Sequence, residues 1–479
     1  MKLTEIQPRE VFRYFEEISG IPRGSGNQEK ISDYCLEFAR EHGFKAERDS
    51  AFNVIIYKDG TPGYEAAEPV ILQGHLDMVC QKEEDHPIDF EKDGLDLCRD
   101  GDYIKARGTT LGGDNGIAVA MMLAILASNT ISHPPIEAVF TTDEEVGMLG
   151  AMALDMSKLK GRKMINMDSE EEDILTVSCA GGSEISMEIP LKREEKSGVY
   201  IRISVKGFKG GHSGVEIHKG RINANGLLAR ILQNAKSVAP FSLVSIDGGD
   251  KANAIPRSGT AILVTEDAAA FLQEVDRYGT IVKEELSARE PDFVLETEIL
   301  PEPAGKAMVP EFSERLLYLL LCAPNGVQEM SVEIPNLVET SLNLGVLKTE
   351  AEQTTLCFAL RSNKQSALTA LEQRLLTFAS CAECKTKLYG QYPPWEFKSD
   401  SALQTLYKEA YQKQFGKEPK VEAIHAGLEC GVFAAALSGM DCISIGPNLY
   451  DVHTTEERMS ISSVERIYGV VLDVLKSCQ

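Results

Sequence analysis

The stretch VFTTDEEVGMLG, residues 139–150, places three adjacent carboxylates, Asp143, Glu144 and Glu145, directly after an apolar run. That run, IEAVFTT, has the length and composition of a buried β-strand. Adjacent carboxylates repel one another, and burying them without compensation is costly. Acids at the end of a buried strand therefore indicate a multivalent cation, provided that other ligands follow other strands.

Four further segments carry histidine or acidic residues just after a predicted strand or in a turn. EPVILQGHLDMV provides His75 and Asp77, GGDNG provides Asp114, NMDSE provides Asp168, and YDVHTTEE provides His453. Strands alternate with helices through these segments, which predicts an α/β fold with a mostly parallel sheet flanked by helices. Such folds place their sites beyond the carboxyl ends of strands. We therefore expect these side chains to converge.

Imidazole and carboxylate ligands together suit zinc, manganese or cobalt. One ion needs only three protein ligands and a water, so this larger set is better explained by two ions that share a carboxylate. Each motif has a simpler interpretation when taken alone: a capped turn for GHLD, a turn or helix cap for GGDNG, a solvated helix start for DEE, a helix N-cap for Asp168 and a loop histidine for His453. Their shared position after strands favours the metal site.

The spacing of these residues indicates which roles they can take in a metal site. Asp77 lies two residues from His75, so its carboxylate can hold the ring nitrogen that faces away from a metal. The glycines around Asp114 let the backbone come close to the ions. Glu144 and Glu145 are neighbours and cannot both point the same way, so one can bind metal while the other acts as general base. The pattern leaves open which residue takes which role.

The pattern of apolar and polar residues changes along the chain, and this change predicts two domains. Residues 187–390 alternate apolar and polar positions between helices, as an α+β insertion with antiparallel strands does. Predicted strands and helices alternate before this insertion and again after it. We therefore expect a discontinuous catalytic domain of residues 1–186 and 391–479. Within the insertion a similar order of elements recurs, starting again at the strand DFVLETEIL, which suggests two copies of one unit.

Composition limits the class of protein. The net charge of −24 argues against nucleic acid or an anionic membrane as a partner, because both need basic patches. MKLTEIQPREVF has no apolar core of a secretory signal, and GIAVAMMLAILA is too short to span a bilayer. The 11 cysteines are scattered, with one C-x-x-C pair, Cys381 and Cys384, which indicates reduced thiols and a cytoplasmic setting.

GHLDMV, GGDNGIAVA, TTDEEVGMLGA, NMDSE and the distal histidine occur in an order that resembles the M20 family of zinc peptidases. KGGHSGVEIHKGRINAN, NAIPR, IHAGLECG and ISIGPN resemble its aminoacyl-histidine dipeptidase branch. The resemblance covers nearly the whole chain and implies two divalent ions, most simply zinc. It also implies that the insertion is a lid or dimerisation-like domain.

The resemblance assigns a role to each matching position in this sequence. His75 and Asp168 would hold one zinc ion, Glu145 and His453 would hold the other, and Asp114 would bridge the two. Glu144 would be the general base toward a metal-activated water, and Asp77 would orient His75.

The insertion would supply groups that bind the substrate. By the same resemblance His212 would support the oxyanion, Asn253 would hydrogen-bond the substrate, and Arg361 would clamp a free carboxylate. Taken alone these three read as a turn histidine, a loop asparagine and an edge-strand arginine. His425 and Glu429 lie where a strand meets a helix, and Glu429 fits either a ligand for the substrate amine or a charge at a helix N-terminus.

The expected function is metal-dependent hydrolysis of small peptides, namely dipeptides of the Xaa-His type and others. Two alternatives remain open at this stage: an M20-type N-acyl-amino-acid deacylase or carboxypeptidase, and a non-catalytic binding protein of the same fold. The sequence also leaves open whether the chain is a monomer or a homodimer, and whether His212 serves its own subunit or a neighbour.

Overall fold

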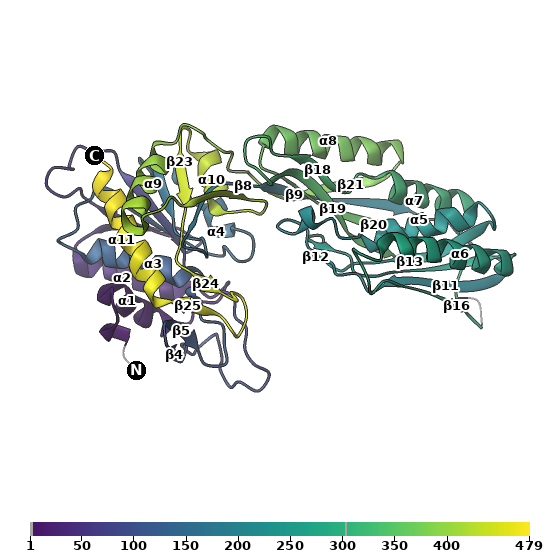
Figure 1. Cartoon of the computed structure of the whole chain (residues 1–479), viewed down its shortest axis with the longest axis horizontal. Coiled ribbons are helices and arrows are strands. Elements are labelled where there is room, and N and C mark those ends of the chain that lie inside the picture. The colour runs from purple at the N-terminus through teal and green to yellow at the C-terminus, as the bar shows by residue number, and fades with distance from the viewer. Residues whose placement is uncertain (1–2, 302–303) are drawn as a thin grey trace. The chain divides into compact units, whose positions relative to one another are not determined.

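A computed structural model describes residues 3–301 and 304–479 and divides the chain into two units (Figure 1). Unit 1 holds the described residues up to Cys179, with Phe397–Ala423 and Leu428–Gln479. Unit 2 holds the described residues of Ala180–Glu396, with Ile424–Gly427. The divisions fall at 179/180 and 396/397 rather than at 186/187 and 390/391, because the strand that ends at Cys179 is followed at once by the first strand of unit 2.

Unit 1 is built on a mixed sheet whose central strands are parallel: β3 lies between β6 and β7, and β23 lies beyond β7. The pairs β1–β2, β2–β6 and β23–β8 are antiparallel, so the parallel part is the centre of the sheet. The strands in sheet order are β1 (Lys45–Arg48), β2 (Val54–Lys58), β6 (Ile136–Thr141), β3 (Val70–His75), β7 (Lys163–Asn166), β23 (Asp441–Ser444), β8 (Ile174–Cys179) and β22 (Lys420–Ile424). The predicted α/β class is confirmed.

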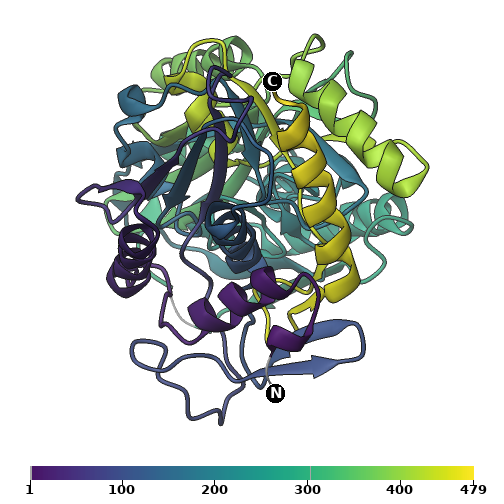
Figure 2. The ribbon, with the colours of Figure 1, turned by 90° about the vertical axis from the view of Figure 1, so that its left-hand side faces the viewer.

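Helices cover this sheet. The apolar helix α3 packs against β3 and α1, α2 packs against β2, and α9 and α10 pack against β23. Figure 2 looks onto unit 1 and shows α11 (yellow) beside α9 (light green), a pair that is in contact. The helices are α1 (Arg9–Ser19), α2 (Glu29–His42), α3 (Gly113–Ala127), α4 (Leu149–Ala153), α9 (Ala402–Phe415), α10 (Glu429–Ala436) and α11 (Ile461–Ser477), with 3-10 turns η1 (Leu3–Glu5) and η2 (Met156–Lys158).

Helix α3 is buried on nearly all sides, as expected for a helix whose sequence is apolar around its whole circumference. A small second sheet joins the turn segments around the C-terminal histidine to an earlier hairpin. Its strands are β24 (Leu449–Tyr450), β25 (Arg458–Ser460), β5 (Tyr103–Ala106) and β4 (Leu97–Asp100). Within residues 3–301 and 304–479, no helix is both long and apolar enough to cross a membrane.

Unit 2 contains two antiparallel sheets with the same topology. The first follows the order β11, α5, β13, β15, α6, β16 along the chain and β16-β11-β15-β13 across the sheet. The second follows β9, α7, β19, β20, α8, β21 along the chain and β21-β9-β20-β19 across the sheet, with β18 added at the edge. Both are β-α-β-β-α-β units, so the duplicated element order corresponds to a duplicated topology.

The second copy begins earlier than the sequence suggested. The strand DFVLETEIL is β16, which pairs with β11 in the first sheet, whereas the first strand of the second copy is β9. Element order along a chain does not reveal pairing partners, which is why the boundary was wrong. The strands are β9 (Gly181–Pro190), β11 (Val199–Lys206), β13 (Phe241–Asp247), β15 (Gly259–Thr265), β16 (Val294–Ile299), β18 (Gly326–Met330), β19 (Val338–Thr349), β20 (Gln353–Ser362) and β21 (Lys385–Tyr392).

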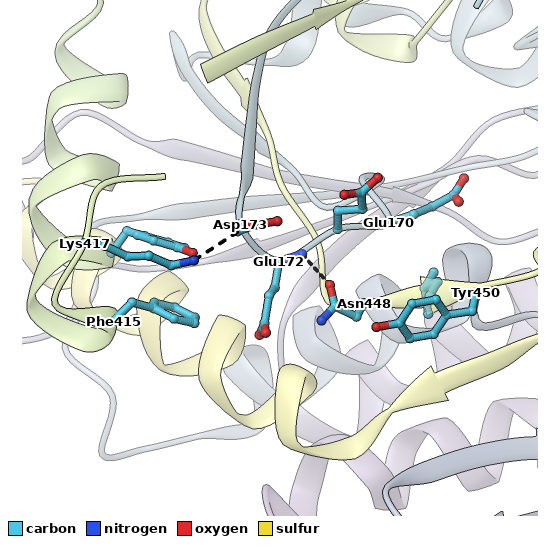
Figure 3. Close-up of a pocket in the computed structure, with 10 residues that line it drawn as sticks. Glu170, Glu172, Asp173, Phe415, Lys417, Asn448 and Tyr450 are labelled. Atoms are coloured by element: carbon cyan, nitrogen blue, oxygen red, sulfur yellow. Dashed lines mark hydrogen bonds and ion pairs between the residues drawn. The ribbon is translucent and has the colours of Figure 1, made fainter. Parts of the chain in front are cut away.

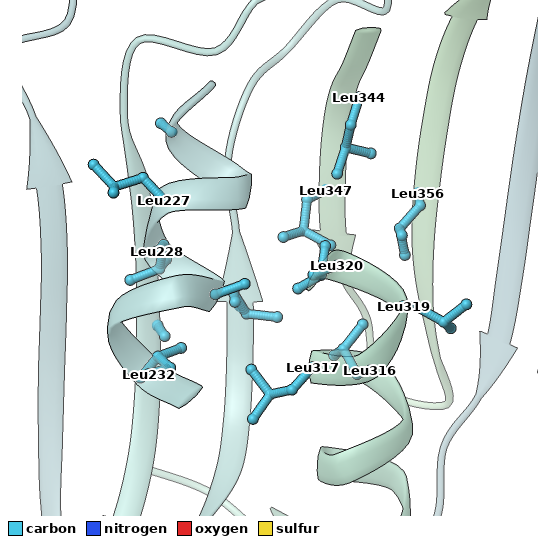
Figure 4. Packing of buried hydrophobic residues seen from close by; sticks show 14 of the residues in the cluster. Leu227, Leu228, Leu232, Leu316, Leu317, Leu319, Leu320, Leu344, Leu347 and Leu356 are labelled. Atoms are coloured by element: carbon cyan, nitrogen blue, oxygen red, sulfur yellow. The ribbon is translucent and has the colours of Figure 1, made fainter. Parts of the chain in front are cut away.

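One apolar core joins both copies (Figure 4). Leucines of α5 and α7 face leucines of β19 and β20, for example Leu228, Leu317 and Leu344. The helices are α5 (Ala224–Lys236), α6 (Ala268–Leu286), α7 (Pro310–Cys322) and α8 (Gln365–Cys381), with η3 (Ile217–Lys219). Two short ribbons, β12 (Gly211–His212) with β14 (Ala254–Ile255) and β10 (Arg193–Glu194) with β17 (Ala307–Met308), complete the unit.

Candidate metal centre

The carboxyl ends of the parallel strands bring the predicted ligands of unit 1 together. His75 ends β3, Glu145 lies just beyond β6, Asp168 lies two residues beyond β7, and Asp114 lies in the first turn of α3. His453 follows β24, on the segment that leaves β23. Five side chains that are widely separated in the sequence therefore meet at one edge of the sheet.

These five residues form two groups of three that share Asp114. In the first group His75 Nε2 lies 3.1 Å from Asp114 Oδ1 and 3.5 Å from Asp168 Oδ1. In the second group His453 Nε2 lies 3.1 Å from Asp114 Oδ2 and 3.1 Å from Glu145 Oε1. Within each group the potential ligand atoms lie within 4.8 Å of one another. Asp114 thus presents one oxygen to each group, which is the arrangement of a carboxylate that bridges two ions.

The three acids of the opening stretch point in different directions. Asp143, whose φ is +50°, turns its carboxylate to the Gly26 N–H at 2.8 Å. Glu145 joins the second group, and Glu144 belongs to neither. The crowding of charge in the sequence is therefore resolved by a separation of the side chains in space.

Asp77 does more than the sequence suggested. Its carboxylate lies 3.5 Å from His75 Nδ1, while the Asp77 carbonyl is closer to that nitrogen at 3.1 Å. The same carboxylate accepts hydrogen bonds from the Glu144 N–H at 3.1 Å, the Glu145 N–H at 3.3 Å and the Ser25 hydroxyl at 2.8 Å. Asp77 therefore fixes the acidic segment beside β3 as well as facing the imidazole.

Asn115 also supports the first group. Its side-chain oxygen accepts from the His75 N–H at 3.2 Å, and its amide donates to the Met167 carbonyl at 2.9 Å. These bonds connect α3 to the ends of β3 and β7. The sequence offered only a general signal for this role, an asparagine next to a ligand in a glycine-rich turn.

The charges of the centre favour cations. Burial raises the pKa of Asp168 to about 6 and raises the pKa of Glu144 well above the range of an ordinary carboxyl, with Asp168 among the neighbouring charges that add to it. Although burial opposes it, hydrogen bonds from His453 and His75 hold the pKa of Asp114 well below its usual range. Hydrogen bonds to Asp114 and Glu145 raise the pKa of His453 to about 11. The cluster therefore holds more buried carboxylates than imidazoles that could balance their negative charge. Bound divalent ions would supply the missing positive charge.

The donor set of these residues fits the ions that the sequence predicted. Two imidazoles and three carboxylates suit zinc, manganese or cobalt better than magnesium or calcium, which prefer oxygen alone. His75 and Asp168 would hold one ion, Glu145 and His453 the other, with Asp114 between them.

A cavity of about 510 Å³ flanks two ligand-bearing segments of unit 1 (Figure 3). Glu170 and Tyr450, which follow Asp168 and precede His453, are among the residues that line it. Two of its other acids are already paired: Glu172 with Arg466 at 2.7 Å and Asp173 with Lys417 at 3.9 Å. The cavity lining therefore offers less unpaired negative charge than the sequence EEED at residues 170–173 suggests.

Glu429 is the first residue of α10 and is fully buried. Its Oε2 accepts hydrogen bonds from the Thr141 hydroxyl at 2.7 Å and from the Gln73 amide. Burial raises its pKa to about 7. The position fits the helix N-terminal alternative more directly than contact with a substrate, because no oxygen of Glu429 is exposed.

Unit 2 gathers the other predicted substrate ligands. His212 pairs with Ala254 between the ribbon strands, and the Asn253 carbonyl accepts from the Ser213 N–H at 2.8 Å. Arg361, at the end of β20, donates from Nη1 to the Tyr392 hydroxyl at 2.7 Å, while its buried Nε has no hydrogen-bond partner among the described residues. Burial and the charge of Arg361 lower the pKa of His212. Unit 2 therefore brings a neutral imidazole and a guanidinium together.

Both ring nitrogens of His425 are engaged within unit 2. Nε2 lies 2.8 Å from the Ser341 hydroxyl and Nδ1 lies 3.1 Å from the Asn363 side-chain oxygen. Burial lowers the pKa of His425 to about 3, with the charge of Arg361 adding to the effect. A neutral ring can donate from Nδ1 and accept at Nε2, so these contacts use its full hydrogen-bonding capacity.

Comparison with known proteins agrees with this geometry. Residues 71–477 match the model of peptidase family M20/M25/M40. The chain is 38% identical over 479 residues to the cytosol non-specific dipeptidase of Escherichia coli (strain K12), which covers 99% of each protein.

Solved structures give the same result. The crystal structure of aminoacylhistidine dipeptidase from Vibrio alginolyticus matches with a TM-score of 0.92 and 36% identity, over 100% of this chain and 98% of that one. Aminopeptidase PepT from Bacillus cereus matches with a TM-score of 0.58 over 99% of each chain, but at 14% identity it shows the fold alone. The chain belongs to peptidase family M20/M25/M40.

Proposed function

We propose that this protein is a dipeptidase that uses two divalent metal ions, most simply zinc, in the cytoplasm. The observation that carries the proposal is the position of Asp114, whose two oxygens each lie 3.1 Å from a different histidine, each in its own group of three ligands. Support also comes from the names of the two similar proteins, a cytosol dipeptidase and an aminoacylhistidine dipeptidase. The free state of all 11 cysteines suits a reducing compartment.

The ions, when bound, would polarise the scissile carbonyl and lower the pKa of a water molecule. Asp143 and Glu144 both lie outside the two ligand groups, but the Asp143 carboxylate accepts the Gly26 N–H, so we assign the transfer of protons to Glu144. Burial raises its pKa, so it accepts a proton more readily than an ordinary carboxylate and can return that proton to the leaving amine. Asp77, which accepts the Glu144 N–H, would keep this carboxyl in place.

We assign substrate binding to the polar groups of unit 2. Arg361 suits a substrate carboxylate because its planar guanidinium presents several donors, of which Nη1 is engaged by the Tyr392 hydroxyl. His212, held neutral by burial, would donate a hydrogen bond to negative charge that develops on the substrate oxygen. Asn253 would bind the peptide, and His425 and Glu429 would position their neighbours. This arrangement favours short peptides with a free carboxylate. The name of the similar aminoacylhistidine dipeptidase adds peptides with a C-terminal histidine to the proposal.

The test is a substrate panel on protein that has been stripped of metal and then reloaded with zinc, manganese or cobalt. The panel pairs free dipeptides, among them β-alanyl-histidine, with their N-acetylated forms and with tripeptides. We expect metal-dependent cleavage of the free dipeptides. Cleavage of only the N-acetylated forms would replace the proposal with a deacylase, and ion binding without cleavage of any member would indicate a binding protein.

A further inference from the structure

Glu457 is a buried carboxylate that sits in a nest of backbone N–H groups. It is only 2% exposed. Oε2 accepts from the N–H groups of Leu111 at 2.8 Å and Gly112 at 3.0 Å, and Oε1 accepts from those of Gly113 at 2.8 Å and Asp114 at 3.4 Å. Four consecutive donors therefore converge on one side chain, which fixes the loop that carries the shared ligand.

Arg23 holds the same loop from its carbonyl side. It is also 2% exposed, and its Nη2 donates to the Gly112 carbonyl. Its Nη1 donates to the carbonyls of Leu76 at 3.0 Å and Asp77 at 3.3 Å, directly after His75. One guanidinium thus joins the turn of the first histidine ligand to the loop of Asp114.

The glycines of this loop leave room for the guanidinium. A Cβ at Gly112 or at Gly116 would lie 2.5 Å from Arg23 Nη2, and a Cβ at Gly113 would lie 3.3 Å from Glu457 Oε1. Gly112 also has a φ of +63°, which other residues adopt only with strain. The GGDNG sequence is therefore shaped to receive Arg23 on one side and Glu457 on the other.

Glu457 lies four residues after His453 and directly before β25, which pairs with β5. The segment that carries the second histidine ligand is therefore anchored to the Asp114 loop as well. Two buried, oppositely charged side chains therefore tie together the segments 75–77, 111–114 and 453–457. In the part of the chain that the structure describes, both bind backbone groups and neither makes a hydrogen bond to a ligand side chain.

We propose that Arg23 and Glu457 are positioning residues that set the distance between the two metal sites by fixing the Asp114 loop between its neighbours. The inference rests on the proposed two-ion centre. Outer groups that orient ligands typically change metal affinity by roughly 10–100-fold when they are removed. We therefore expect the loss of either residue to weaken ion binding at one or both sites while the fold persists.

The experiment measures ion stoichiometry and affinity by competition with a chelating dye, using zinc alone, for the unmodified full chain and four variants. Glu457→Gln keeps the shape but brings amide donors toward backbone donors, and Arg23→Lys keeps the charge but loses the fork that reaches two segments. Glu456→Gln is the matched control, because its side chain is 69% exposed and paired with Lys105. A combined Arg23→Met and Glu457→Gln variant removes both buried charges together, in case one unpaired charge prevents folding.

At least tenfold weaker zinc binding in Glu457→Gln and Arg23→Lys, with normal binding in Glu456→Gln, would support the proposal. A lower Tm with unchanged zinc affinity in these variants would overturn it, because a purely structural role predicts that result. If a single variant does not fold, the combined variant decides by the same criterion. Failure of the unmodified chain to bind two zinc ions would instead refute the proposed function.

Discussion

Replacing Asp168 by asparagine should make the metal-free protein more stable at neutral pH. Burial raises the pKa of Asp168 from 3.8 to about 6 in the folded chain. The folded state therefore binds a proton more tightly than the unfolded state, so this group lowers the free energy of unfolding as the pH rises from about 4 to about 6. At 1.36 kcal/mol per pKa unit, the loss above pH 6 is about 3 kcal/mol. Asparagine resembles the neutral form and avoids this loss.

The assay is thermal unfolding of chelator-treated protein at pH 4, 6 and 8. At roughly 2 °C per kcal/mol for a unit of this size, Asp168→Asn should unfold up to roughly 6 °C above the unmodified protein at pH 8 and at nearly the same temperature at pH 4. Asp96→Asn, at a side chain that is 71% exposed, serves as the control and should change neither value. Zinc should reverse the order at pH 8, because the variant lacks a ligand. An equal gain at pH 4 and pH 8, or no gain at pH 8, would refute the reasoning.

Four further variants probe separate parts of the molecule. Glu144→Gln should lower kcat by roughly 10²–10⁴-fold with two ions still bound, and normal turnover would remove Glu144 from the proton transfer. Asp114→Asn should reduce binding of both ions in a metal titration, since one carboxylate serves both groups; loss of a single ion would contradict the shared role. Arg361→Lys should raise KM for free dipeptides at least tenfold with a smaller change in kcat, and an unchanged KM would exclude a carboxylate contact. Leu228→Ala, in the core of unit 2, should lower the free energy of unfolding by about 2–5 kcal/mol in denaturant titration, whereas a change below about 1 kcal/mol would mean that the core collapses around the gap.

The ligand cluster could be predicted from the sequence because strand ends of a parallel sheet lie on one edge. Each candidate ligand follows a strand or begins a helix, and residue type and position together predicted that these side chains would converge: His75, Asp114, Glu145, Asp168 and His453. Which of Glu144 and Glu145 joins the ligands could not be read from the pattern, because it depends on how the backbone turns after Asp143.

The supporting residues were not predictable in the same way. The side chains of Arg23, Glu457 and Asn115 bind backbone groups of other segments. Because nearly every residue type carries these backbone groups, the sequence of a segment does not show that it is such a partner. The pairing of β16 with β11 was missed for a related reason, since many strands of this length and pattern compete for the same partner. The antiparallel direction of the edge strands in the main sheet could not be predicted either, because a pattern of buried and exposed residues does not encode strand direction.

Unit 2 is inserted between two parts of unit 1, and this order has a consequence for synthesis on the ribosome. Strand β7 is complete at Asn166, yet one of its two neighbours, β23, is not made until Ser444. Throughout the intervening translation that strand has an open edge, the kind of surface that recruits wrong partners. The strands β11 to β16 are contiguous and can form their own sheet meanwhile, whereas β9 must wait for β20 and β21. Because His453 emerges last among the predicted ligands, a nascent chain that ends before it lacks part of the second ligand group.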